Sequence, residues 1–306
     1  MALLAALLLG QPGVAQSPPL AEWSLVWSDE FNAPQIDPAH WSLEDDCWGG
    51  GNEEQQCYWP SGRNAAVANG TLVITARREA ATGPAWPLQV RAGGQHQGET
   101  ASKPYTSAKL TTRGKAAWRY GKVEVRAKLP RGQGTWPAIW MLPASDSYGA
   151  WAASGEIDIL EAVNLGEPCR QCPGGRENRI LGTLHYGGNW PKNEHKGEVV
   201  PFGEVLDGQF HTYCIEWTPD RITWQFDGRT YATRTDAEWW SAGSKDRGAP
   251  FDRDFYLILN LAIGGHLTET PGKAITSGFP KRMEVDWVRV WQKPSQAATA
   301  PISGGR

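Results

Sequence analysis

The sequence has no excess of charge of one sign. Its 306 residues include 30 basic and 33 acidic side chains, mixed along the chain, for a formal net charge of -3. Without a basic stripe, the chain lacks the electrostatic footprint of proteins that bind nucleic acid or anionic membranes. We therefore expect neither partner, and the charge balance fits a neutral substrate.

Long apolar runs are missing except at the start. Residues 1–16 are largely apolar and end in small residues near Ala15, as in a secretory signal peptide, although the usual basic segment is absent. This run is too short to span a bilayer, and no other segment is long and apolar enough to do so. We expect a secreted or periplasmic protein with no membrane partner.

Cysteine is scarce and metal-binding spacing is absent. Cys47 and Cys57 bracket a glycine-rich loop, and Cys169 and Cys172 form a C-x-x-C within another loop. Each pair can close a local disulfide in an exported protein, which leaves Cys214 as a buried thiol. No second C-x-x-C or histidine cluster completes a zinc site. We expect no cofactor to be required for catalysis.

Helical periodicity is also absent, apart from a turn or two near residues 236–240, and alternation with a period of two takes its place. Asp227-Gly228 separates two alternating runs, which is a strong short signal for a tight hairpin. Many strands joined by glycine and proline turns predict an all-β antiparallel sandwich or barrel. The clearest predicted strands are residues 71–77, 122–129, 221–231, 255–263 and 283–291.

The chain reads as one domain, over residues 20–292, followed by a flexible tail at 293–306. Two segments interrupt the strand pattern, residues 79–103 and 165–177. Loops of such length in compact domains are often functional. We expect both to border a cleft.

Three carboxylates lie within six residues of a predicted buried strand, at Glu156, Asp158 and Glu161. In a regular strand Glu156 and Asp158 share a face and Glu161 points the other way. A β-bulge between Asp158 and Glu161 would restore it to that face, and bulges are common beside active sites. Repulsion between close carboxylates raises the pKa of at least one, which suits acid catalysis. The alternative is an exposed strand with solvated acids, but Ile157, Ile159 and Leu160 argue for a core on the other side.

The acid strand and its context resemble glycoside hydrolase family sixteen, in particular its bacterial laminarinase-like endo-β-1,3-glucanases. The similarity is carried by E-I-D-I-L-E at 156–161 and by ordered matches along nearly the whole mature chain. These are W-S-D-E-F-N at 27–32, G-N-E-E-Q-Q at 51–56, Y-G-K-V-E-V-R-A-K-L-P at 120–130, G-T-W-P-A-I-W-M-L at 134–142, G-T-L-H-Y at 182–186, F-H-T-Y at 210–213 and V-D-W-V-R-V at 285–290.

The resemblance implies a two-sheet antiparallel β-jelly-roll sandwich with an open concave substrate cleft, and retention of anomeric configuration. By motif position, Glu156 is the nucleophile that forms a glycosyl-enzyme intermediate. Glu161 protonates the leaving oxygen and then activates water. Asp158 lies between them and can share a proton with the nucleophile.

Further site residues follow from the same motifs. The resemblance implies that Trp136 and Trp140 stack on glucose rings, that His185 lies beside the acids, and that Asn52 and Glu54 bind sugar hydroxyls or shape the non-reducing end. Core packing is the alternative for the two tryptophans and for the histidine. Asp286 lies where some members of the family bind a structural calcium, although one carboxylate does not make a calcium site.

One departure from the family pattern affects the cleft. Where its laminarinases continue into a short Trp-Pro-Gly, this chain has Gly265-His-Leu-Thr-Glu-Thr-Pro-Gly272, so one cleft tryptophan is lost or displaced. Trp48, Trp59 and Trp86 are candidate replacements.

The leading hypothesis is a secreted, monomeric endo-β-1,3-glucanase acting on laminarin-like β-glucan. One alternative is a non-catalytic β-glucan-binding module. Another keeps the chemistry but changes the polymer to mixed-linkage β-1,3-1,4-glucan or to a galactan.

Overall fold

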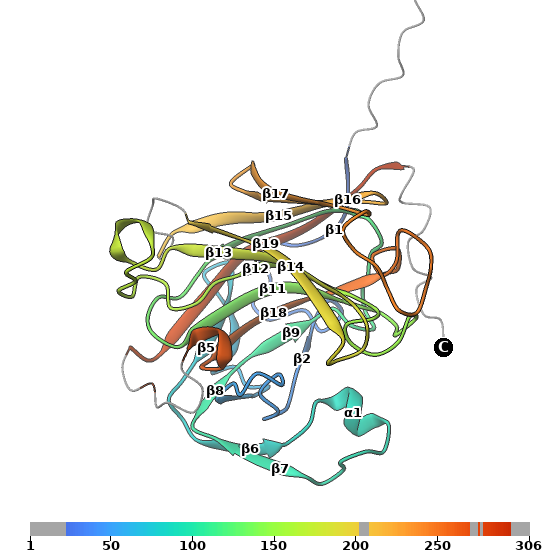
Figure 1. Ribbon diagram of the computed structural model, residues 1–306. Coiled ribbons are helices and arrows are strands. Elements are labelled where there is room, and N and C mark those ends of the chain that lie inside the picture. The colour runs from blue at the N-terminus through green and yellow to red at the C-terminus, as the bar shows by residue number, and fades with distance from the viewer. Residues whose placement is uncertain (1–22, 202–207, 270–274, 276–277, 295–306) are drawn as a thin grey trace, which may run out of the picture.

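Two large antiparallel sheets pack face to face in the computed structural model (Figure 1). The structure describes residues 23–201, 208–269, 275 and 278–294. The predicted all-β jelly-roll sandwich is confirmed. The expected signal peptide at 1–16 and most of the tail at 293–306 lie outside the described residues.

The first sheet has eight strands. Seven follow the order β17, β16, β15, β10, β19, β5, β4, and β1 also pairs with β19. Their bounds are β1 Ser24–Asp29, β4 Ala65–Ala68, β5 Thr71–Ala76, β10 Gly121–Lys128, β15 Phe210–Thr218, β16 Arg221–Phe226, β17 Arg229–Thr235 and β19 Lys281–Gln292.

The second sheet has seven strands and carries the three acids on β12. Its order is β14, β13, β12, β11, β18, β9, β2. The bounds are β2 Ser42–Leu43, β9 Lys109–Thr111, β11 Thr135–Pro143, β12 Glu156–Glu161, β13 Arg179–Gly187, β14 Asn193–Pro201 and β18 Phe255–Ile263.

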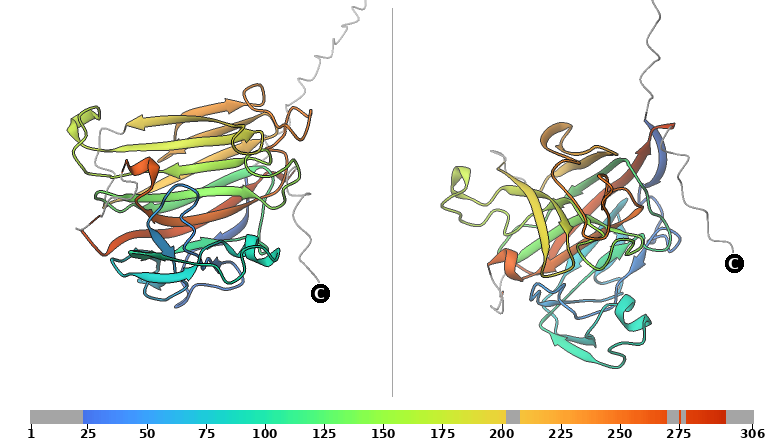
Figure 2. Two further views of the ribbon diagram at one scale, coloured as in Figure 1. Left: turned by 60° about the horizontal axis from the view of Figure 1, so that its bottom comes forward. Right: turned by 45° about the vertical axis from the view of Figure 1, so that its right-hand side comes forward.

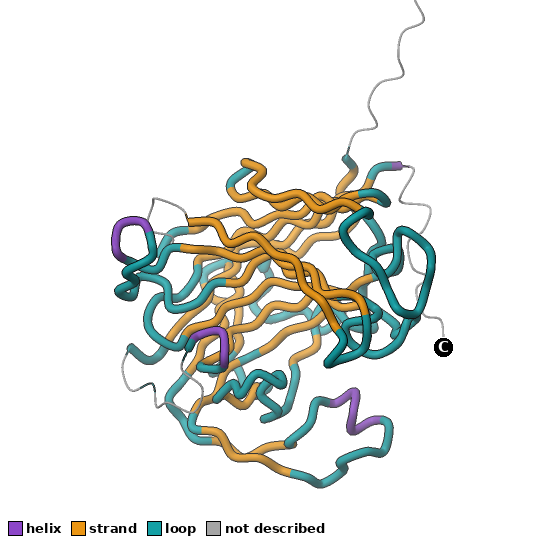
Figure 3. Tube along the Cα trace, in the orientation of Figure 1, coloured by secondary structure: helices purple, strands orange, loops and turns teal. Residues whose placement is uncertain are grey.

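The core lies between these two sheets because their strands alternate as the sequence predicts. On β10, apolar and charged residues take turns, and so do buried and half-buried positions. Trp217, Trp224 and Phe255 are among the largest fully buried side chains, and they join one apolar cluster with residues of both sheets. The layered arrangement of the strands is visible in Figure 2, and their predominance over helices in Figure 3.

The segment 79–103 contains more structure than the loop expected from its sequence. It forms an antiparallel pair, β6 Ala81–Pro84 and β7 Thr100–Lys103, with the short helix α1 Leu88–Ala92 between them. This hairpin lies at the bottom of Figure 1, outside the two layers. It is held by long-range contacts, since the backbone N–H of Cys47 donates to the carbonyl of Pro84 at 2.7 Å.

The remaining short elements among the described residues are a parallel pair and two 3₁₀ turns. Strands β3 Gln56–Tyr58 and β8 Tyr105–Ser107 pair in parallel, and the turns span Pro173–Gly175 and His266–Thr268. Within the described residues, none of the helices has the length and apolar character needed to cross a membrane.

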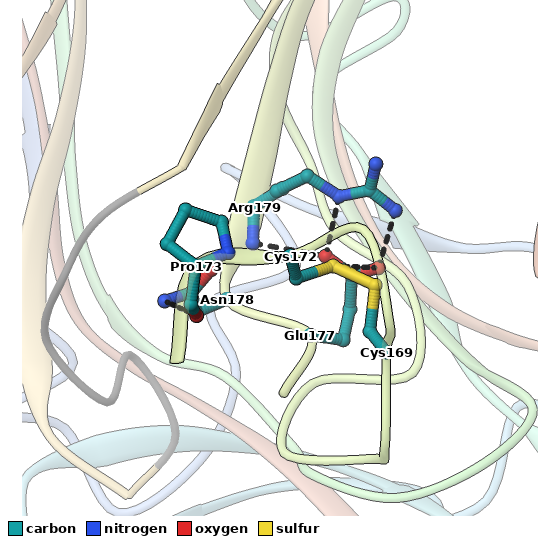
Figure 4. Close-up of a disulfide and its surroundings, with 6 residues drawn as sticks. All are labelled: Cys169, Cys172, Pro173, Glu177, Asn178 and Arg179. Carbon is teal, nitrogen blue, oxygen red and sulfur yellow. Dashed lines mark hydrogen bonds and ion pairs between the residues drawn. A yellow bond between two sulfur atoms is a disulfide. The ribbon is translucent and has the colours of Figure 1, made fainter. Parts of the chain in front are cut away.

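Both predicted disulfides form, Cys47–Cys57 and Cys169–Cys172, and Cys214 is a buried free thiol. Figure 4 shows the second bond beside Glu177, which accepts hydrogen bonds from Arg179. The predicted hairpin at Asp227-Gly228 joins β16 to β17, and both turn residues have positive φ, 45° and 75°, as a type I′ turn requires.

Candidate active site

The acid strand carries the predicted bulge. Asp158 pairs with Thr183 of β13, whereas Glu161 pairs with Leu181, so the register shifts between the two acids. The register of β12 also shifts against β11, its neighbour on the other side, between the pairs Ile139–Leu160 and Trp140–Asp158. Ile157, Ile159 and Leu160 are fully buried in the core. The bulge therefore returns Glu161 to the face that already carries Glu156 and Asp158.

Glu156, Asp158 and His185 form a compact group, and Glu161 is close enough for its charge to act on Asp158. A carboxylate oxygen of Glu156, one of Asp158 and a ring nitrogen of His185 all lie within 4.8 Å of one another. His185 Nε2 is 3.3 Å from Asp158 Oδ2 and 3.8 Å from Glu156 Oε1. The histidine therefore lies beside the acids, as the sequence predicts.

Burial raises the pKa of every acid in the group. It is the largest cause for Glu156, whose pKa rises to about 8, and the charge of Asp158 adds to the effect. The pKa of Asp158 is raised well above its usual value by burial and by the charge of Glu161. The pKa of Glu161 is raised by burial and lowered in part by a hydrogen bond from Trp136. Such a site retains protons near neutral pH.

Trp136 connects Glu161 to the loop that carries Asn52 and Glu54. Its indole N–H donates to Glu161 Oε1 at 3.0 Å. Gly265 lies against the other side of the ring and has a φ of 89°. A Cβ added at Gly265 would be 3.1 Å from Trp136 Cζ3, 3.1 Å from the carbonyl oxygen of Asn52 and 3.2 Å from Glu54 Cγ. Glycine thus permits close packing of this loop against the tryptophan.

A chain of hydrogen bonds ties Trp140 to Glu54. The indole of Trp140 donates to Asn260 at 2.7 Å, the amide of Asn260 donates to the Tyr58 hydroxyl at 3.0 Å, and that hydroxyl donates to Glu54 at 3.3 Å. Gln56 donates to the same Glu54 oxygen at 2.7 Å. The buried Glu54 carboxylate is therefore held by neutral donors next to the acid group.

The structure thus brings Glu156, Asp158, Glu161, Trp136, Trp140, His185, Asn52 and Glu54 together. Residues 52–289 match the sequence model of the family described as glycosyl hydrolases family 16. The chain belongs to this family. Its predicted enzyme class, glycoside hydrolase, is confirmed.

Relatives and solved structures agree with the family assignment. A glucan endo-1,3-beta-glucosidase of Cryptopygus antarcticus is 38% identical over 278 residues, which cover 88% of this chain and 92% of that protein. A glucan endo-1,3-beta-glucosidase of Niallia circulans is 37% identical over 92% of this chain, which spans only 39% of that longer protein. The X-ray structure of the laminarinase from Rhodothermus marinus is 38% identical, with a TM-score of 0.70 over 90% of this chain and 99% of that one.

One residue of this family 16 site was not predicted. Trp151 is 38% exposed, and its indole N–H donates to Glu156 Oε2 at 2.7 Å. Its ring centroid lies 5.5 Å from that of His185. Trp151 is close to the acids in sequence, five residues before Glu156. The alternation of a strand, however, gives no signal for the turn that brings the Trp151 side chain back to the Glu156 carboxylate.

Asp286 lies apart from this group. It is on β19 of the other sheet, where its carboxylate forms an ion pair with the guanidinium of Arg126. Neither of the two groups of three potential metal ligands among the described residues includes Asp286. The guanidinium disfavours a second cation at this carboxylate. The calcium expectation therefore gains no support here and stays a prediction.

The three candidate replacements for the missing tryptophan have different surroundings. Trp86 stacks on His96 with centroids 4.2 Å apart, so one of its faces is covered. Trp59 is 37% exposed and lies in a surface pocket with Arg63 and Glu79. Trp48 is 40% exposed and lies in the same disulfide-closed loop as Asn52. Of the three, Trp48 is the one that lies in the loop that carries Asn52 and Glu54.

Proposed function

We propose that this family 16 enzyme is an exported, monomeric, retaining endo-glycosidase that hydrolyses β-1,3-glucosidic bonds in laminarin-like β-glucan. The observation that carries the proposal is the bulge in β12, which places Glu156, Asp158 and Glu161 on one face. The substrate is supported by the printed activities of the relatives and by the near-neutral charge of the chain. Export is supported by the two disulfides, since such bonds persist in oxidising compartments.

Glu156 is the proposed nucleophile. It must be ionised to attack the anomeric carbon and form a covalent glycosyl-enzyme intermediate. Asp158 lies between the two glutamates on the bulged strand and can share a proton with Glu156. Burial raises the pKa of both groups, so the pair holds a proton near neutral pH, and in the proposed mechanism this proton lies on Asp158 when Glu156 is ionised. The protonated Asp158 can then donate a hydrogen bond to the ionised nucleophile.

Glu161 is the proposed general acid and base. Burial raises its pKa, so the carboxyl group holds the proton that the leaving oxygen needs. Once the intermediate has formed, the same carboxylate accepts a proton from the attacking water. The indole N–H of Trp136 holds this carboxyl in place at 3.0 Å.

Reducing-sugar release from laminarin, measured for the wild type and for Glu156→Gln, tests this function. We expect the variant to lose essentially all activity, and equal release by both proteins would refute the catalytic assignment. Proton NMR of fresh products should show the β-anomer first, whereas an α-anomer would refute Glu156 as nucleophile. A panel of laminarin, lichenan, agarose and carrageenan distinguishes the β-1,3-glucanase from enzymes of mixed-linkage glucan or of galactans. Binding of laminarin without cleavage of any polymer would favour the binding module.

A further inference from the structure

Trp224 reaches from the opposite sheet to the backbone of the acid bulge. It lies on β16, is 1% exposed, and its indole N–H donates to the backbone carbonyl of Asp158 at 2.8 Å. In a regular strand a carbonyl points along the sheet toward a neighbouring strand. Here the bulge turns the Asp158 carbonyl into the space between the two sheets, where only the core can supply a donor.

The strand beside the bulge leaves room for this indole. Gly182 lies on β13 between Leu181 and Thr183, which are the partners of Glu161 and Asp158. A Cβ at Gly182 would be 2.5 Å from Trp224 Cδ1 and 2.7 Å from Trp224 Nε1. A side chain at this position would also meet the Tyr231 hydroxyl at 2.7 Å, so it would force the indole and this hydroxyl to shift.

We propose that Trp224 is a positioning residue for the reaction, because its indole N–H fixes the bulged backbone of Asp158 and thereby the placement of Asp158 between Glu156 and Glu161. Trp224 touches no substrate, and it acts through the backbone alone. The ionisable side chains around Asp158 are Glu156, Glu161 and His185. A shift of the Asp158 backbone alters the distance of its carboxyl group from each of them.

The chain offers a matched control. Trp217 lies on β15 in the same sheet, is also 1% exposed, and its indole N–H donates to the carbonyl of Phe251 at 3.0 Å. Trp217→Phe therefore removes the same kind of buried hydrogen bond as Trp224→Phe, but away from the bulge. Both variants leave a buried carbonyl without its donor and should lose thermal stability.

The test compares kcat, KM and the pH profile of laminarin hydrolysis for the two variants, at a temperature where both are folded. We expect Trp224→Phe to lower kcat by about 10- to 100-fold with KM nearly unchanged, since small misplacements of catalytic groups have effects of this size. Its pH profile should also shift. Trp217→Phe should keep the kcat and the pH profile of the wild type.

Values of kcat and pH profiles that agree for both variants and the wild type would overturn the positioning role, and so would a loss confined to KM. If Trp224→Phe does not fold, Gly182→Ala provides the second test, because its methyl group forces the indole to shift, and the same selective loss of kcat is expected. The inference rests on the proposed function. A wild type that cleaves no polymer contradicts that function, whereas an active wild type with an unimpaired Trp224→Phe contradicts only the role of Trp224.

Discussion

Replacing Trp151 by phenylalanine should move the pH dependence of catalysis in a defined direction. The indole N–H of Trp151 donates to Glu156 Oε2 at 2.7 Å and stabilises the ionised carboxylate, so it lowers the pKa of Glu156 against the larger effect of burial. Phenylalanine keeps a ring but has no donor. The pKa of Glu156, about 8 in the wild type, should therefore rise further in Trp151→Phe.

The size of this shift follows from the hydrogen bond. A bond to a charged group contributes about 1.5 to 3 kcal/mol, and one pKa unit corresponds to about 1.36 kcal/mol. Because Trp151 is 38% exposed, water replaces part of the lost bond, and the lower end applies. We expect an upward shift of about one unit.

The assay is the pH profile of kcat/KM on soluble laminarin, whose acid limb reports ionisation of the proposed nucleophile, Glu156, in the free enzyme. The limb should move to higher pH in Trp151→Phe, with activity recovered in alkaline buffer. Trp190→Phe is the control, since Trp190 is 73% exposed and its backbone N–H, which the substitution keeps, donates to the carbonyl of Trp151 at 2.8 Å. An acid limb at the wild-type position in Trp151→Phe would refute the assignment of the raised pKa to Glu156.

Three further predictions concern the acid group and its rim. Glu156 has a folded-state pKa raised to about 8, so its contribution to stability is fully present below its unfolded pKa and is lost as pH rises through about 8. By calorimetry, Glu156→Gln should have a higher melting temperature than the wild type near pH 9 and the same melting temperature near pH 4. Replacing Cys47 and Cys57 by serine opens a loop closed over a separation of 10 residues, which should lower the unfolding free energy by about 2 to 3 kcal/mol in urea titrations and raise KM for laminarin. Gly265→Ala forces a Cβ to 3.1 Å from Trp136 at φ of 89°, and should lower kcat/KM by about tenfold or more; unchanged kinetics would contradict the tight packing at this point.

The sequence patterns predicted the features of the fold that depend on neighbouring residues, namely strands and tight turns. The alternation at 122–129 predicted β10 Gly121–Lys128 almost to the residue, and Asp227-Gly228 predicted its turn, because period and turn geometry are short-range properties. The bulge followed from the acid spacing, since only an extra residue puts Glu161 beside the other two acids. The paired strands within 79–103 were missed because their stability comes from docking onto the disulfide-closed loop, at residues distant in sequence.

Contacts between segments that are distant in sequence could not be predicted either, because no local pattern shows which residues meet. Asn260 and Tyr58 link Trp140 to Glu54, although 202 positions separate the asparagine from the tyrosine. Asp286 pairs with Arg126, which is 160 positions away. An isolated motif shows a side chain's type and strand, but its partner depends on sheet order, which strand patterns do not specify.

The hydrogen-bond donors around Glu156 and Glu161 are of a kind that orients the carboxyl groups and leaves their pKa values raised. Among the described residues, the groups that lower the pKa of Glu156 or Glu161 are His185 and the indoles of Trp151 and Trp136, not an arginine or lysine. A guanidinium at this distance would hold each carboxylate ionised and would lower its pKa. Indole N–H groups orient an oxygen without neutralising its charge, so burial still raises the pKa. Substituting lysine or arginine at Trp136 would therefore depress the pKa of Glu161 and remove the proton that Glu161 gives to the leaving oxygen in the proposed mechanism, even where the fold is kept.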